Sequence, residues 1–177
     1  LYRRKNHMYN YKIVEQVIRR PKPLTGILRV IMIIFAAILL LLGVTISQGF
    51  MLPGFLLVVL YYFYNTYSQK EYEYILEDNH LTIDVIFGKK HRRSAHYLDM
   101  DSLEVLAPNW HNAVAKYRKN GGSIRLVKYD YTSYEEDTPF YTMIITENRE
   151  KIKILLDLSD SMLQMIKRRY PDRVFLS

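Results

Sequence analysis

A period of two marks residues 71–87, which read EYEYILEDNHLTIDVIF. Tyr72, Tyr74 and Leu76 alternate with glutamates, an Asp-Asn-His stretch follows, and apolar residues then recur at every second position up to Phe87. A period of two is typical of strands with one buried face, and a short polar stretch between two such runs is typical of a turn. The segment therefore predicts a β-hairpin.

The same pattern continues downstream of this hairpin. A longer connection begins at Asn109 and ends in Gly121-Gly122. Ser159 or Asp160 is expected to cap a closing amphipathic helix, which Pro171 stops. The predicted strands are 71–77, 81–87, 91–97, 103–107, 123–131, 140–147 and 151–157.

Seven antiparallel strands in groups of four and three, followed by one helix, are the layout of the pleckstrin-homology (PH) superfold. The run from Tyr74 to Ile83, with Gly88-Lys89-Lys90 and Leu103-Glu104-Val105, resembles the bacterial PH-like domains that follow one or two membrane helices. The whole chain resembles an uncharacterised bacterial membrane-protein family with an N-terminal two-helix hairpin. The resemblance implies a membrane α-hairpin plus an α+β, mainly-β PH-like domain, either a seven-stranded bent sandwich or a partly open barrel, capped by its C-terminal helix. It brings no activity with it.

Two long apolar runs precede the predicted strands. Residues 24–46 contain one charge, Arg29, and residues 50–68 contain none. At about 1.5 Å per residue, each run is long enough to cross a hydrocarbon core of roughly 30 Å. Neither run has a polar face, which favours a transmembrane hairpin over a helical hairpin buried in a soluble core. The expected divisions are a basic segment, a hairpin and a cytosolic domain at 1–23, 24–68 and 71–177.

The net charge of +7 lies in residues 1–29, which precede the uncharged part of the first apolar run. Residues 1–29 hold eight Lys or Arg and one acid, Glu15, whereas residues 30–177 hold 17 basic and 17 acidic residues. By the positive-inside rule, this end of a multi-pass hairpin faces the cytoplasm, and both termini with it, in the cell (plasma or inner) membrane. Tyrosines at the end of the second run add an aromatic belt. The predicted interface residues are Arg19, Arg20, Lys22, Arg29, Tyr61, Tyr62, Tyr64 and Tyr67.

Two places in the chain leave alternatives open. Met8–Arg20 has apolar residues at intervals of three and four, which predicts a short amphipathic helix. It lies either on anionic lipid, where each Lys or Arg adds about 1 kcal/mol, or against the cytosolic domain. Trp110 either docks its loop on the domain, which we favour, or dips into the membrane interface.

The predicted domain contains two clusters of charge. The run 131–138 holds three acids without the spacing of an EF-hand, and a flexible hairpin loop is favoured there over a calcium site. In PH domains that bind phosphoinositides the cationic pair lies around the first hairpin. Here that turn is Glu77-Asp78-Asn79, so the resemblance argues against such a pocket. The basic cluster is a candidate contact for headgroups or an acidic partner, with a solvated hairpin tip as the alternative; it comprises Lys89, Lys90, Arg92 and Arg93.

No catalytic signature is present, so an enzyme is not expected. Glycine-rich phosphate loops and the common hydrolase motifs are missing, and the apolar runs contain no acid for a proton or ion path. Without cysteine there is no thiolate ligand, and the scattered histidines predict no metal and no cofactor. Nucleic acid is discounted as a partner, because the basic excess flanks the apolar run.

Together these features predict a membrane-anchored PH-like adaptor that presents a protein-interaction module at the bilayer surface. Its expected partners are the lipid bilayer and another membrane protein or peptide segment, bound at a sheet edge or beside the terminal helix, with the oligomeric state left open. The alternative function is anionic-lipid sensing, or a regulatory subunit of a membrane complex.

Overall fold

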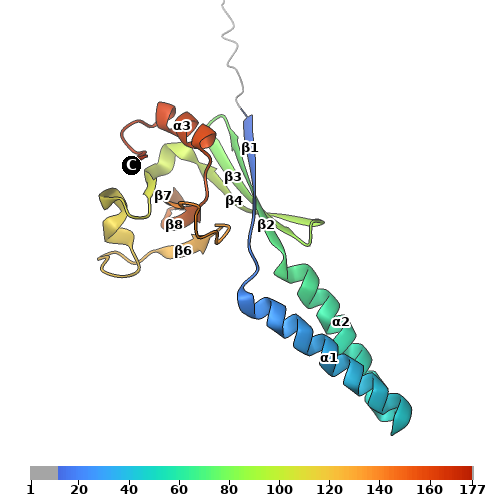
Figure 1. The fold of residues 1–177 in the computed structure, drawn as a ribbon. Coiled ribbons are helices and arrows are strands. Elements are labelled where there is room, and N and C mark those ends of the chain that lie inside the picture. Colours follow the sequence, from blue (N-terminus) through green and yellow to red (C-terminus); the bar gives the residue numbers. More distant parts are fainter. Residues whose placement is uncertain (1–11, 177) are drawn as a thin grey trace, which may run out of the picture. The chain divides into compact units, whose positions relative to one another are not determined.

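The computed structural model describes residues 12–176, which divide into two compact units. The helical unit comprises residues 18–71 and 86–92. The folded domain comprises the described residues outside those two ranges (Figure 1). The helices therefore interrupt the domain in sequence, since strand residues lie on both sides of them.

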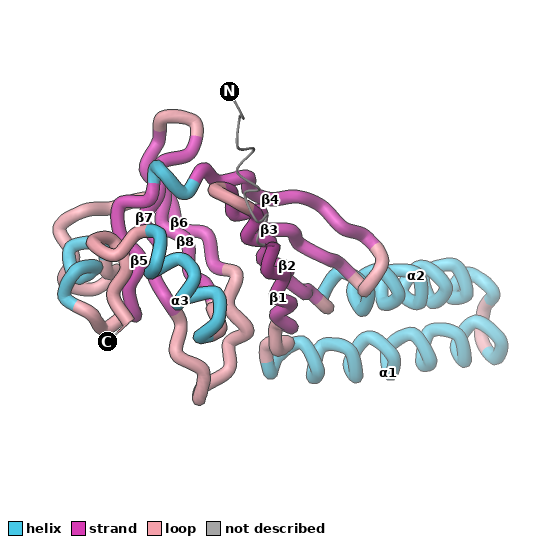
Figure 2. Tube along the Cα trace, turned by 90° about the horizontal axis from the view of Figure 1, so that it is seen from above, coloured by secondary structure: helices cyan, strands magenta, loops and turns pink. Residues whose placement is uncertain are grey.

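Two neighbouring helices make up most of the helical unit (Figures 1 and 2). α1 spans Pro23–Thr45 and α2 spans Met51–Ser68, joined through a short 3-10 turn at Gln48–Phe50. Pro23 starts α1 at a position where a missing N–H breaks no helical hydrogen bond. Both apolar runs are confirmed as helices.

The two helices approach each other through glycines. A Cβ on Gly43 would lie 2.6 Å from Cγ of Met51 and 3.0 Å from its backbone nitrogen. A Cβ on Gly54 would lie 2.8 Å from Cδ2 of Leu40. A larger residue would clash at this contact. The two glycines do not form a small-xxx-small motif, so the sequence did not predict the contact.

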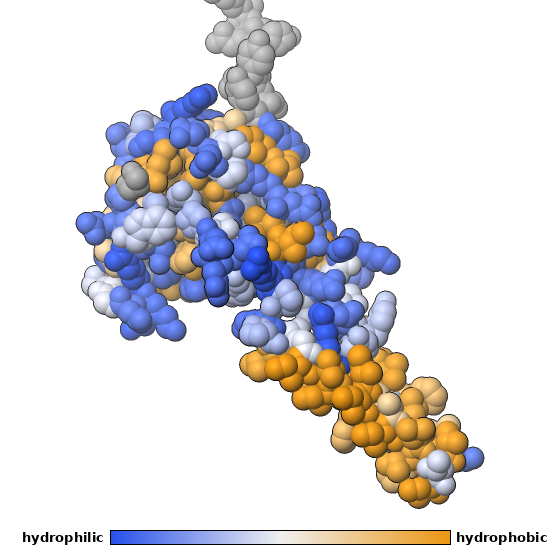
Figure 3. Space-filling view, viewed as in Figure 1, coloured by the Kyte–Doolittle hydropathy of each residue, from blue (hydrophilic) through white to orange (hydrophobic). Residues whose placement is uncertain are grey.

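Away from this contact, the helices expose apolar side chains. Both helices are long and apolar enough to cross a membrane. Their only buried residues are Ala36 and Gly43 in α1 and Gly54 in α2. Figure 3 shows a continuous apolar surface along the hairpin and a mainly polar surface over the domain. A hairpin inside a soluble core would hide these side chains, whereas here they are bare.

The described strands form two four-stranded sheets (Figure 2). The first sheet has the order β1-β2-β3-β4, with the bounds Lys12–Ile18, Lys70–Glu77, His80–Phe87 and His91–Asp99. The second has the order β5-β7-β8-β6, with the bounds Leu103–Pro108, Tyr141–Glu147, Glu150–Leu156 and Val127–Asp130.

The prediction of seven antiparallel strands is wrong in two respects. The structure describes eight strands, because β1 precedes the hairpin. β6 is shorter than the predicted 123–131, and it pairs with β8 in parallel, with Val127 opposite Ile152 and Asp130 opposite Leu155. The long connection before β6 lets the chain return in the same direction as β8.

The predicted amphipathic helix is also wrong, since Lys12–Ile18 is a strand, while residues 8–11 of that segment lie outside the described residues. Four of the seven residues in β1 are β-branched, which favours extended backbone. Ile13 and Val17 pack against the core, and Val14 between them is 49% exposed. The helix-like spacing arose because apolar residues lie on both faces of this edge strand.

Both sheets and α3, Asp160–Arg169, contribute to one hydrophobic core. Ser159 caps α3 by accepting a hydrogen bond from the Met162 N–H at 3.3 Å. The hydroxyl of buried Tyr74 donates to the Tyr131 carbonyl oxygen at 2.6 Å, and burial raises its pKa. The core residues with no measurable exposure include Tyr74, Leu81, Ile83, Leu106, Met143, Ile145, Ile154 and Met162.

The connection between β5 and β6 covers part of the outer face of the second sheet. Its 3-10 segment, Asn112–Tyr117, places Val114 and Tyr117 against Val105 and Ile144 of the sheet. This cluster leaves the neighbouring part of the same face, over β6 and β8, available for a cavity.

Candidate functional site

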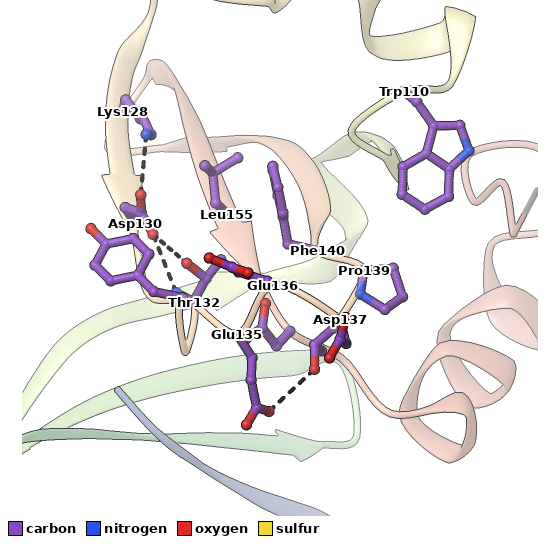
Figure 4. Close-up of a pocket in the computed structure, with 13 residues that line it drawn as sticks. Trp110, Lys128, Asp130, Thr132, Glu135, Glu136, Asp137, Pro139, Phe140 and Leu155 are labelled. Carbon is purple, nitrogen blue, oxygen red and sulfur yellow. Dashed lines mark hydrogen bonds and ion pairs between the residues drawn. The ribbon is translucent and has the colours of Figure 1, made fainter. Parts of the chain in front are cut away.

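A cavity of about 600 Å³ opens on this outer face of the second sheet. β6 and β8 supply Lys128, Asp130 and Leu155, and the loop from β6 to β7 supplies most of the acids (Figure 4). Figure 4 shows the Trp110 ring across the cavity from Lys128. The lining residues are Trp110, Lys128, Asp130, Thr132, Tyr134, Glu135, Glu136, Asp137, Thr138, Pro139, Phe140, Leu155 and Asp157.

Carboxylates dominate the lining of this cavity. Five lining side chains are acidic and one is basic, which gives a formal charge of −4. Lys128 Nζ lies 3.1 Å from Asp130 Oδ2. Burial acts to raise the pKa of Asp130, but hydrogen bonds from Thr132 and Lys128 outweigh burial and lower the pKa. Asp130 is therefore charged at neutral pH, and the cavity is acidic in a chain of net charge +7.

Asp157 is the buried carboxylate of this group. It directly follows β8, is 8% exposed, and accepts a hydrogen bond from the Ser133 N–H to its Oδ2 at 2.6 Å. Its Oδ1 is buried as well and has no hydrogen-bond partner among the described residues. A buried carboxylate oxygen without a donor is costly, and Asp157 Oδ1 is in this position.

A smaller cavity of about 290 Å³ adjoins the first and shares Lys128, Phe140 and Leu155 with it. Lys153 Nζ lies in its wall and donates to the Tyr117 carbonyl oxygen at 2.6 Å. Burial lowers the pKa of Lys153. The remaining basic side chains of this cavity are those of Arg118 and Lys119. The outer face thus carries an acidic cavity beside a basic one.

The basic turn between β3 and β4 lies beside the end of α2, within the helical unit. The Gly88 N–H donates to the Gln69 carbonyl oxygen at 3.0 Å. Gly88 has φ +55°, and a Cβ there would lie 2.6 Å from Cγ2 of Thr66, so both conformation and space require glycine. The basic residues that follow are all exposed: Lys89, Lys90, Arg92 and Arg93.

The predicted interface residues of the helical unit gather at the same end of the hairpin. The Arg29 guanidinium donates to Ser68 Oγ at 2.7 Å and so links the start of α1 to the end of α2. The Arg19 N–H donates to the Lys70 carbonyl oxygen at 3.0 Å, which joins the segment before α1 to the residues after α2. We name this end the basic collar; it comprises Arg19, Arg20, Lys22, Arg29, Lys70, Lys89 and Lys90, with Tyr61, Tyr62, Tyr64 and Tyr67.

The acidic loop was visible in the sequence, but the cavity was not. Glu135, Glu136 and Asp137 are consecutive, whereas Asp130 and Asp157 join them only through the parallel pairing of β6 with β8. No local pattern predicts that pairing.

The preferred interpretation of Trp110, docking on the domain, is wrong. The residue is 61% exposed and lines the acidic cavity. The guanidinium of Arg118 donates to the backbone carbonyl oxygen of Trp110, so the backbone is held while the ring stays open to solvent.

The four histidines within residues 12–176 do not converge on one centre. His96 is buried, and its Nδ1 lies 2.7 Å from Glu147 Oε2. Within residues 12–176, no group of three or more His, Asp or Glu side chains is arranged to hold a metal ion.

One family model matches this chain. It is described as bacterial PH-like domain (DUF6106) and matches residues 10–176. No curated protein and no solved structure matches the chain. The match covers both sheets, α3 and the two apolar helices.

Proposed function

Because the chain belongs to this family of bacterial PH-like domains, we propose that it is a membrane-anchored adaptor. The hairpin crosses the cell membrane twice, both termini are cytoplasmic, and the domain binds a segment of another membrane protein. It acts by binding and not by catalysis. The observation that carries this proposal is a bare apolar hairpin, which is inserted in the sequence between β1 and β2 of a domain that bears an open cavity.

The sheet pairing supports the proposed topology. β1 precedes the hairpin and β2 follows it, and the two strands are neighbours in one sheet. A chain that leaves a sheet and returns to the adjacent strand must begin and end its excursion on one side of the bilayer. Since the basic collar lies at that end, the positive-inside rule assigns it to the cytoplasm.

The short tether supports a partner at the membrane. Only Gln69 separates the end of α2 from the start of β2. A domain held this closely meets membrane-bound partners at a high effective concentration.

Single-cysteine labelling tests the topology, because the chain has no cysteine of its own. We expect a membrane-impermeant maleimide to label Gln48→Cys, in the turn between the helices, in intact cells. Asn120→Cys, exposed in the domain, should react only after permeabilisation. Labelling of Asn120→Cys in intact cells would contradict the cytoplasmic placement of the domain, and release of the chain by alkaline carbonate would contradict the membrane anchor.

The second candidate function is contact with anionic lipid by the basic collar. The observation that favours it is the hydrogen bond from Gly88 to Gln69, which holds Lys89 and Lys90 at the end of α2. Lys70 Nζ lies 5.5 Å from the centre of the Phe87 ring at the same end. Basic side chains at an interface each contribute about 1 kcal/mol to binding anionic lipid.

A further inference from the structure

We propose that the acidic cavity holds a lysine or arginine side chain of an extended partner segment. The inference rests on the proposed adaptor function and names the chemistry of its partner. It concerns the cavity over β6 and β8.

The lining of the cavity is complementary in charge to a cationic side chain. Its lining carries a formal charge of −4, and the Lys128 ammonium is already within 3.1 Å of Asp130. Asp157 also lines the cavity, and its buried Oδ1 has no donor among residues 12–176. An ammonium or guanidinium group brings both the positive charge and the N–H donors. The exposed Trp110 ring adds a face on which a cation is attracted to the π system.

The position of the cavity favours an extended segment over a small cation. β6 is the edge strand of its sheet, so a peptide strand can pair along it. Lys128 and Asp130 are two apart and both face the cavity, as alternate residues of a strand must. Side chains opposite them on an added strand would lie about 5 Å away, on the same face. Every second side chain of the partner then points toward the carboxylates.

Peptide binding to the full chain tests this inference. The protein is placed in nanodiscs of phosphatidylcholine only, so that lipid attracts no cation. The probe is a capped, fluorescent octapeptide of alternating threonine and lysine, and its control has glutamine in place of lysine. We expect the lysine peptide to bind at least tenfold more tightly than the glutamine peptide, because glutamine cannot form the charge-assisted hydrogen bonds that lysine forms with the carboxylates.

Substitutions locate the site of binding. Asp157→Asn and Asp137→Asn should each raise the dissociation constant of the lysine peptide about tenfold, with an unchanged melting temperature. Glu150→Gln removes the same charge at an exposed turn outside the cavity and should change the constant less than twofold. If Asp157→Asn unfolds the protein, the dissociation constant of the loop variant Asp137→Asn alone shows whether the peptide binds at the cavity.

Three outcomes would overturn the inference while leaving the adaptor function standing. The first is equal affinity for the two peptides. The second is a folded Asp137→Asn variant with wild-type affinity. The third is displacement of the peptide by spermine or calcium at the peptide's own concentration, which would assign the cavity to a small cation. Release of the full chain from the membrane by alkaline carbonate would instead refute the membrane-anchored adaptor itself.

Discussion

At the scale of single residues, the basic collar gives a prediction about lipid. Lys89→Glu with Lys90→Glu should lower the ratio of phosphatidylglycerol to neutral lipid that purifies with the protein at least fivefold, because each lysine contributes about 1 kcal/mol. Lipid mass spectrometry of the purified chain measures the ratio. Lys119→Glu with Arg125→Glu makes the same charge change on the exposed surface of the domain and should leave it unaltered. Equal ratios in both double variants would remove lipid sensing as a function.

The sequence predicted which charges these surfaces carry better than it predicted which residues come together in them. The run from Lys89 to Arg93 and the acids at 135–137 are contiguous, so the sequence displays them. Asp157 could not be singled out, because nothing local shows that its Oδ1 is buried without a donor. Trp110 was misjudged because burial normally stabilises an aromatic ring, whereas this ring is exposed and lines an open cavity.

At the scale of elements, the contact between α1 and α2 depends on glycine. Gly43→Val should lower the melting temperature of the protein in detergent by several degrees, because the new side chain meets the Met51 backbone and overpacking costs about 1–3 kcal/mol. Gly26→Val makes the same change in the same helix, where a Cβ would meet no atom of a neighbouring segment within 4 Å, and should leave the melting temperature nearly unchanged. Similar melting temperatures for the two variants would show that the helices do not pack as described.

The elements that were mispredicted are those whose form is set by distant partners. β1 has apolar residues on both faces, so its period is ambiguous until β2 pairs with it. β6 has four residues and takes its direction from β8. The apolar helices and the strongly alternating hairpin at 71–87 were predicted correctly, because their signals are local and long.

At the scale of the whole molecule, two apolar helices joined to a PH-like domain were predicted. The insertion of the two helices between two strands of that domain was not predicted. The hairpin is inserted between β1 and β2, whose paired ends, Arg19 and Lys70, are about 50 residues apart. Closing so long an excursion costs conformational entropy that the sequence pattern does not reveal. Insertion of both helices into a bilayer would hold the two ends together before the sheet forms.

Site-specific photocrosslinking in cells tests the central claim, that the membrane-held domain binds a partner at the acidic cavity. A photoreactive amino acid replaces Trp110 at the cavity or Tyr97 on β4, which are 61% and 64% exposed. We predict an adduct with a membrane protein at position 110 that is absent at position 97 and is lost when Asp157→Asn is added. The same adducts at both positions, or none at position 110, would contradict the account.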